Sequence, residues 1–200
     1  HPCSRTGILE NNPIHRDMVA AGKIAKLAYI VNVVIDEEKK TVAAFAGDFE
    51  EAHAAGVAFL RQFCEVQAIP GDIVITSNGG APLDQNIYQC VKSMTAAEAC
   101  CREGGVIILC AECADGHGGE GFYRALTDCE SPAALYDEQM ATPQDKTAPD
   151  QWESQILARI LSRFHVVLVS QCDPALVRAM KMHPAADLAQ ALDQIAPASR

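Results

Sequence analysis

Residues 71–92, GDIVITSNGGAPLDQNIYQCVK, carry the most informative pattern in this 200-residue chain. Ile73-Val74-Ile75 is a short β-branched run, which is typical of a strand buried on both faces. Asn78 and the pair Gly79-Gly80 predict a turn, because glycine tolerates positive φ and lets other groups approach the backbone. Pro82 suits the first turn of a helix, where its missing N–H needs no partner. The stretch therefore predicts a strand, a glycine turn and a helix in direct succession.

The predicted helix has an apolar side and a polar side at about 100° per residue. The apolar side holds Leu83, Ile87, Cys90, Val91, Met94 and Cys101. The polar side holds Gln85, Tyr88, Gln89 and Lys92. Helix statistics favour a plain solvated face for the polar side. The alternative is a cluster that faces a ligand or a second domain, since open α/β sheets bind ligands beyond the carboxyl ends of their strands.

The composition predicts one globular domain, with 49% hydrophobic and 21% charged residues. The net charge of −10 argues against partners that need basic patches, namely nucleic acid and anionic membranes. No apolar stretch approaches the roughly 20 residues of a transmembrane helix. Nine cysteines, mostly in apolar stretches, are typical of the reduced thiols of a cytosolic protein. We therefore expect a cytoplasmic protein.

Capping residues and apolar periodicity predict alternating helices and strands. Helices are expected at residues 13–27, 48–68, 82–103, 122–126, 131–136, 151–164, 173–182 and 187–195, with Gly104-Gly105 ending the third. Strands are expected at residues 29–36, 41–46, 73–75, 106–110 and 165–170, and the short turn at 37–40 makes the first two a hairpin. The fold class is α/β, a Rossmann-like mainly parallel sheet flanked by helices, with an N-terminal β-hairpin. The opening HPCSRTG lacks an initiator Met, and a doubly wound sheet would add a strand after residue 195. We therefore expect a piece of a longer protein.

Three loops leave the carboxyl ends of predicted strands, at residues 77–80, 112–121 and 171–173, where parallel sheets bind ligands. Asn78 and Gly79 lie in the first loop, and Asp115 and His117 lie in the second. His117 is the best acid–base candidate, because an unperturbed histidine changes charge near neutrality. The alternative is a loop histidine bonded to neighbouring backbone. A zinc site at Cys110, Cys113 and His117 is a further alternative, although it lacks a second CxxC pair.

Three runs of sequence resemble one known family closely. They are ITSNGGAPLDQNIYQCVKSM, GGVIILCAECADGHGGEGFYR and the opening HPCSRTGILENNPIHRDM. Together they resemble the nickel-pincer-dependent lactate racemase family, specifically its C-terminal domain, across essentially the whole chain. The resemblance implies that residues 1–200 are the C-terminal α/β domain of a racemase or epimerase. It also implies that the N-terminal domain, which tethers the nickel-pincer nucleotide, is absent here.

In that family the cofactor takes a hydride from the carbon bearing the hydroxyl of a 2-hydroxy acid and returns it to either face. The proton-relay histidines belong to the N-terminal domain, so the resemblance places no catalytic residue and no metal ligand in this chain. It matches Tyr88, Gln89 and Lys92 to a substrate-binding segment, with Lys92 holding the substrate carboxylate. Trp152 matches a tryptophan near the same cleft, although core packing is an alternative for it. Which 2-hydroxy acid is the substrate depends partly on the absent domain.

A second class of function stays open from the residues alone. The strand-end loops could serve a non-catalytic module that binds a small molecule or a nucleotide. The GxSxG and GxxxxGK[ST] motifs are absent, so nucleophilic and P-loop chemistry have no support. The expected partners are the N-terminal domain of the same protein and a small 2-hydroxy acid.

Overall fold

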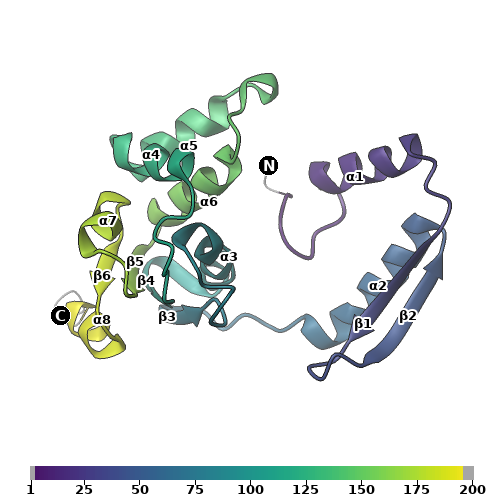
Figure 1. Cartoon of the computed structure of the whole chain (residues 1–200), viewed down its shortest axis with the longest axis horizontal. Coiled ribbons are helices and arrows are strands. Elements are labelled where there is room, and N and C mark those ends of the chain that lie inside the picture. Colours follow the sequence, from purple (N-terminus) through teal and green to yellow (C-terminus); the bar gives the residue numbers. More distant parts are fainter. Residues whose placement is uncertain (1–2, 196–200) are drawn as a thin grey trace. The chain divides into compact units, whose positions relative to one another are not determined.

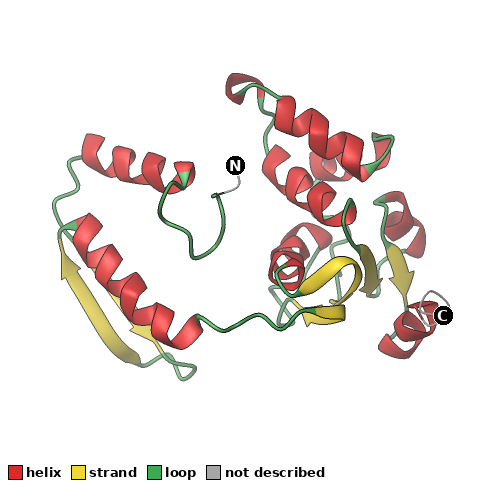
Figure 2. Cartoon of the chain, turned by 180° about the vertical axis from the view of Figure 1, so that it is seen from behind, coloured by secondary structure: helices red, strands yellow, loops and turns green. Residues whose placement is uncertain are grey.

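The computed structural model describes residues 3–195, which divide into two compact units at Gln67/Ala68 (Figure 1). Unit 1 contains α1 (Pro13–Ile24), β1 (Ile30–Ile35), β2 (Thr41–Gly47) and α2 (Phe49–Cys64). Unit 2 starts with β3 (Gly71–Ser77), α3 (Ile87–Glu98), β4 (Cys101–Cys110), α4 (Glu120–Asp128) and α5 (Pro132–Ala141). It continues with η1 (Gln144–Lys146), α6 (Gln151–Leu161), β5 (His165–Val169), α7 (Pro174–Ala179), β6 (His183–Ala185) and α8 (Leu188–Ile195). The alternation of helix and strand along the chain is visible in Figure 2.

Unit 1 is an antiparallel hairpin with a helix on either side of it in sequence. β1 and β2 pair as expected and form a two-stranded sheet of their own. Asn12 caps α1 by accepting hydrogen bonds from the N–H groups of residues 14 and 15, and Pro13 occupies the first turn. Asp48 caps α2 in the same way, through the N–H groups of residues 50 and 51. Local capping therefore fixes both helix starts where the sequence predicts them.

Unit 1 buries very little apolar surface. Among residues 3–67, Ala52 is the one apolar side chain that is buried. The larger apolar side chains that stay exposed are Ile8, Ile14, Met18, Ile24, Leu27, Tyr29, Val31, Val33, Ile35, Val42, Leu60, Phe63 and Val66. A unit of this size cannot offset its conformational entropy with so small a core.

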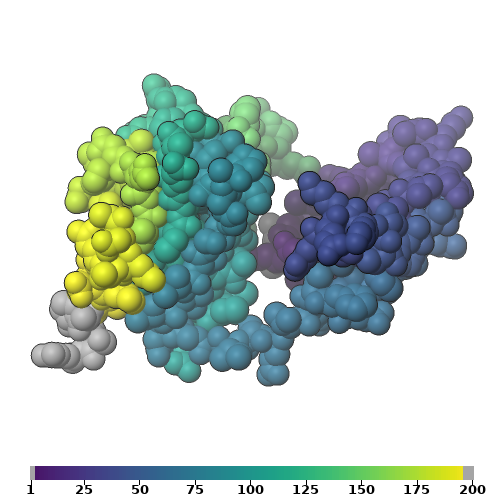
Figure 3. Space-filling view, turned by 60° about the horizontal axis from the view of Figure 1, so that its bottom comes forward, coloured from purple at the N-terminus to yellow at the C-terminus, as the bar shows by residue number. Residues whose placement is uncertain are grey.

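Unit 2 is built on a four-stranded parallel sheet in the order β3-β4-β5-β6. Ile107, Leu109, Val166 and Leu168 point to one face, in a core shared with α3 to α7. Ile108 and Val167 point to the other face, where Ala191 of α8 packs. The elements from β3 to α8 lie together in one body in the space-filling view (Figure 3). The predicted parallel α/β fold is confirmed in this unit.

Two boundaries predicted around α3 are wrong. The helix begins at Ile87, because residues 80–86 give their backbone groups to turns and to a neighbouring loop, and Asn86 rather than Pro82 starts it. Leu83 is consequently 61% exposed and not a core residue. The helix ends at Glu98, and Gly104-Gly105 lies within β4, as does Cys101. A Cβ on Gly105 would lie 2.7 Å from the Asp72 carbonyl oxygen, so this irregular part of the strand pair requires glycine.

The short strand β6 was not predicted from the sequence. β6 pairs with β5 in parallel, but its three residues include Pro184 and carry no β-branched side chain. A proline that cannot donate to a ladder is tolerated at a sheet edge, where β6 lies. The other elements differ from prediction by the few residues expected at fraying ends, and the expected strand beyond residue 195 lies outside the described residues. In residues 3–195 no helix is long and apolar enough to cross a membrane.

The contrast between the two cores predicts different behaviour for the separated units. Residues 68–200 expressed alone should show a single cooperative urea transition, because the parallel sheet carries buried side chains on both faces. Residues 1–67 expressed alone should show no cooperative transition, because Ala52 is their one buried apolar side chain in the described part. Circular dichroism during urea titration measures both. A cooperative transition in the 1–67 peptide would contradict this account.

Candidate functional site

The loops that follow β3, β4 and β5 meet at the carboxyl end of the sheet, as predicted. The N–H of Glu112 donates to Asp84 Oδ2 at 3.0 Å, and the N–H of Cys113 donates to the Asp84 carbonyl at 2.9 Å. The third loop joins them through the N–H of Gln171, which donates to the Glu112 carbonyl at 3.2 Å. Asp84 is 7% exposed, so these bonds lie in a largely dry environment. The three loops therefore form one connected platform.

Asn86 positions the start of α3 on this platform. Its side-chain oxygen accepts a hydrogen bond from the N–H of Gln89 at 3.0 Å, which satisfies one of the free donors of the first turn. Gly118 lies against the Asn86 side chain with φ at +83°, and a Cβ there would be 2.4 Å from Asn86 Cγ. The first N–H groups of α3 donate to the carbonyls of Gly116 and His117. The glycine-rich loop therefore fixes the position and direction of the first turn of α3.

Tyr88 and Trp152 form an aromatic wall beside that first turn. The Tyr88 hydroxyl donates to Asp150 Oδ1 at 3.0 Å, and its ring meets Trp152 edge-on at a centroid distance of 6.0 Å. Phe122 packs against the same ring at 5.4 Å. Burial and the neighbouring Asp150 raise the pKa of Tyr88 to about 12, so the phenol keeps its proton at neutral pH. Trp152 is 51% exposed, which rules out simple core packing for it.

Gln89 and Lys92 supply the polar groups next to this wall. Lys92 Nζ donates to Gln89 Oε1 at 2.6 Å, one turn apart on α3. Lys92 is exposed and Gln89 half-buried, while the opposite side of α3 is buried at Ile87, Cys90, Val91 and Met94. The structure thus brings the four predicted substrate-binding residues onto two packed helices, α3 and α6.

Glu153 is a further acidic group beside this cluster, which sequence reasoning missed. It is 1% exposed, and neither carboxylate oxygen has a hydrogen-bond partner among the described residues. Burial raises the pKa of Glu153 to about 7; Lys92 opposes the shift and Asp150 adds to it. A glutamate in the first turn of a predicted helix carries no sequence signal of burial. Asp84 and Asp150 were missed because their partners are distant in the sequence. Asn86, which caps α3 locally, was missed because Pro82 predicted an earlier helix start.

The four predicted cleft-loop residues have separate positions. The Asn78 amide donates to the carbonyls of Leu83 and Gln89, so it ties the first loop to α3. Gly79 takes a φ of +84°, as its place in the turn requires. The N–H of Asp115 donates to the Gln85 carbonyl, and its side chain is exposed. His117 Nδ1 accepts from the N–H of Gly119 at 3.1 Å while its ring stacks on Tyr123 at 4.7 Å.

The zinc alternative finds no support in this geometry. Within residues 3–195 no three side chains of His, Cys, Asp or Glu come together in a way that could hold a metal ion. Cys113 instead lies with its sulfur 3.8 Å from that of Cys90. The contact with Cys90 and burial raise the pKa of Cys113 well above the usual thiol range, so the group is a protonated core thiol.

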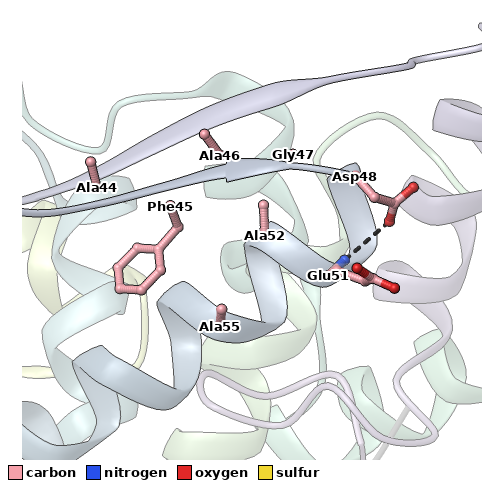
Figure 4. Close-up of a pocket in the computed structure, with 8 residues that line it drawn as sticks. All are labelled: Ala44, Phe45, Ala46, Gly47, Asp48, Glu51, Ala52 and Ala55. Carbon is pink, nitrogen blue, oxygen red and sulfur yellow. Dashed lines mark hydrogen bonds between the residues drawn. The ribbon is translucent and has the colours of Figure 1, made fainter.

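An open hollow of about 360 Å³ lies in unit 1 between β2 and α2 (Figure 4). Its walls are Ala44, Phe45, Ala46, Gly47, Asp48, Glu51, Ala52 and Ala55. The charged groups in this lining are the carboxylates of Asp48 and Glu51, and Asp48 is occupied in capping α2. An anionic ligand would find no counter-charge in this lining, so we place no functional site there.

Unit 2 is, on this geometry, a parallel α/β domain with an ammonium, an amide and an aromatic wall near its strand ends, which is the edge where such folds bind ligands. The model of the lactate racemase C-terminal domain family matches residues 66–199. The chain belongs to the lactate racemase family.

Two curated relatives are similar in sequence to nearly the whole chain. The lactate racemase of Thermoanaerobacterium thermosaccharolyticum is 56% identical over 193 residues, covering 96% of this chain and 45% of the relative. The lactate racemase of Lactiplantibacillus plantarum is 53% identical over 194 residues, covering 96% of this chain and 46% of the relative. The chain therefore spans about half the length of these relatives.

Solved structures confirm the fold. The apoprotein structure of the Thermoanaerobacterium thermosaccharolyticum lactate racemase superposes with a TM-score of 0.92 at 56% identity, covering 97% of this chain and 47% of that one. A Thermotoga maritima protein superposes with a TM-score of 0.57 at 14% identity over 88% of this chain and 47% of its own, and shares the fold alone.

The contact between Gly118 and Asn86 predicts a sharp difference between Gly118, which lies in the loop after β4, and Gly121, which lies in the first turn of α4. Gly118→Ala should lower the free energy of unfolding by about 1–3 kcal/mol, because the new methyl group displaces the Asn86 cap and the residue has positive φ. Gly121→Ala is the matched control: it lies in α4 with open space around it, and should be neutral or stabilise by up to about 1 kcal/mol. Urea denaturation compares the two; equal effects would show that the close approach is unimportant.

Glu153 predicts a pH-dependent stability. A folded-state pKa of about 7, above the ordinary value of 4.5, disfavours the ionised form in the folded protein. Stability is therefore lost as pH rises from about 4.5 to about 7 and stays constant above, a loss of up to about 3 kcal/mol. Glu153→Gln removes that loss. Relative to the parent, it should gain stability between about pH 4 and about pH 8 in urea unfolding, whereas Glu138→Gln on exposed α5 should not.

Proposed function

We propose that unit 2 is the substrate-binding C-terminal domain of a nickel-dependent racemase that inverts lactate or a related 2-hydroxy acid. The observation that supports this most directly is the gathering of Lys92, Gln89, Tyr88 and Trp152 on α3 and α6. The names of the relatives add the substrate class, since both are lactate racemases. The reaction itself belongs to the whole protein, of which the chain corresponds to about half.

Each of the four side chains has a role in this proposal. The Lys92 ammonium pairs with the substrate carboxylate, a charge-assisted bond that strengthens in a cleft shielded from water. The Gln89 amide oxygen, which already accepts from Lys92, holds the ammonium at a fixed place, and its NH₂ group is left to bind the acid. The Tyr88 ring and the exposed Trp152 indole flank these groups and exclude water from one side.

The nickel-pincer nucleotide is proposed to be held outside these residues. In residues 3–195 no set of His, Cys, Asp or Glu side chains has the grouping a metal needs. The described residues thus fit a carboxylate and not nickel, and we assign no metal ligand and no hydride-transfer step to them. Proton-relay histidines are likewise proposed for the residues that the longer relatives have in addition. A cytoplasmic location remains a prediction from the cysteine content.

Unit 1 is proposed to pack against those additional residues of the same protein. Alternate residues of β1, namely Val31, Val33 and Ile35, are 64%, 53% and 54% exposed. A two-stranded sheet is marginal in water, and one with an apolar exposed face needs further strands or a helix against it. The family model begins at residue 66, next to the boundary between the units. The N-terminal domain is therefore the partner that would complete the core of unit 1.

The test is racemisation of L-lactate by the full-length protein loaded with the nickel cofactor, followed by chiral analysis of the product. Lys92→Met should lower kcat/KM about 30- to 1000-fold, chiefly through KM, because it removes the charge partner of the carboxylate. Lys146→Met is the control, since that exposed lysine lies 3.9 Å from Asp145 on the short helix η1. It should leave kcat/KM unchanged.

Two results would count against the proposal. Unchanged kinetics in Lys92→Met would remove the assigned role of Lys92. No turnover of lactate or any other 2-hydroxy acid, with the cofactor demonstrably bound, would discard the racemase and favour a binding module. Loss of all turnover on removal of nickel is the expected result.

A further inference from the structure

Glu153 differs from the other buried acidic groups of unit 2 in having no partner. Glu98 pairs with Arg159 at 2.5 Å, and Asp84 accepts from the N–H of Glu112 at 3.0 Å. Both oxygens of Glu153, by contrast, are buried without a hydrogen-bond donor among the described residues. A buried carboxylate without donors is costly when charged and less so when protonated. Such a group is set to respond to any change of charge beside it.

Glu153 lies on α6 next to Trp152, and α6 packs against α3, which carries Lys92. Lys92 of α3 favours the charged form of Glu153, and Asp150 before α6 disfavours it. The charge of Glu153 in turn acts on Tyr88 of α3. α6 also packs against α4 and α5. The charged side chains of those two helices are Glu120, Arg124, Asp128, Asp137 and Glu138, all exposed and none among the groups that shift Glu153.

We propose that Glu153 is a positioning residue that takes up one proton when an anionic substrate pairs with Lys92, so that substrate binding and protonation of this buried carboxylate are coupled. The inference rests on the proposed binding of a 2-hydroxy acid at Lys92. Lys92 is the cation that stabilises charged Glu153, and the substrate carboxylate competes for that same ammonium. Once the ammonium is paired with the substrate carboxylate, the buried carboxylate of Glu153 loses part of that stabilisation and is repelled by the new anion.

The uptake is a simple proton balance. Solvent supplies one H⁺, Glu153 passes from carboxylate to carboxylic acid, and the substrate keeps its own charge. The neutral acid then leaves Lys92 fully available to the substrate. Below the pKa of Glu153, about 7, the group is already protonated and binding takes up nothing. Above it, affinity falls as the proton becomes scarcer, approaching tenfold per pH unit.

The experiment is isothermal titration calorimetry of the full-length, cofactor-loaded protein with racemic lactate, which undergoes no net turnover. Titrations in buffers of different ionisation enthalpy measure the protons taken up per site. At about pH 8.5 the parent should take up about one proton, and its Kd should be about 20-fold weaker than at about pH 6.5. Glu153→Gln should take up none and bind with nearly the same Kd at both pH values.

Two further variants distinguish the effect of ionising residue 153 from the effect of changing its size and shape. Glu153→Asp keeps an ionisable group and should keep the proton uptake. Glu138→Gln makes the same chemical change on an exposed part of α5 and should behave like the parent. A residue with a merely structural role would change Kd equally at every pH and leave the proton count alone.

The outcomes distinguish this inference from the proposed function. Lactate binding without proton uptake in the parent, or with uptake retained in Glu153→Gln, overturns the coupling and leaves the binding site standing. Absence of lactate binding in the parent overturns the proposed function and the coupling together. Uptake that disappears in Glu153→Gln, persists in Glu153→Asp and is unaffected in Glu138→Gln supports the coupling.

Discussion

The arrangement of the loops at the carboxyl end of the sheet in unit 2 depends on the attachment of Asp84 to the loop after β4. Its carboxylate and its carbonyl accept from consecutive N–H groups of that loop, at residues 112 and 113. The same loop accepts from the first N–H groups of α3 through Gly116 and His117. Both sets of bonds need the chain after β3 to remain a turn until residue 86. The start of α3, and with it the position of Tyr88, Gln89 and Lys92, follows from this constraint.

The charged side chains around α3 and α6 differ in whether they have a hydrogen-bond partner. The Asp150 carboxylate accepts from the Tyr88 hydroxyl and Lys92 donates to the Gln89 amide, whereas the buried Glu153 carboxylate has no hydrogen-bond donor among residues 3–195. An apolar side chain at position 153 would fill the space without the desolvation cost of a carboxylate. Retaining an acid there is costly for stability, which is the pattern expected of a group that serves the site and not the fold.

The sequence predicts the parallel sheet, the hairpin and most helix caps, because these depend on local patterns of side chains. It fails where distant residues determine the structure: Pro82 looks like a helix start, but the hydrogen bonds between residues 84–88 and the loop at 112–117 delay the helix to Ile87. β6 is an edge strand of three residues whose pairing with β5, rather than its composition, defines it. The polar side of α3 is evident from periodicity. Its companions Asp150 and Glu153 are not, since nothing local distinguishes them from solvated acids.

The distribution of burial between the units bears on where function resides. Unit 2 has a layered core on both faces of its sheet and would position its polar cluster without help from outside. Unit 1 has exposed apolar side chains on β1, and a two-stranded sheet of this kind is marginal in water without a further layer against it. The polar cluster of Tyr88, Gln89 and Lys92 therefore lies on the unit that has the larger core.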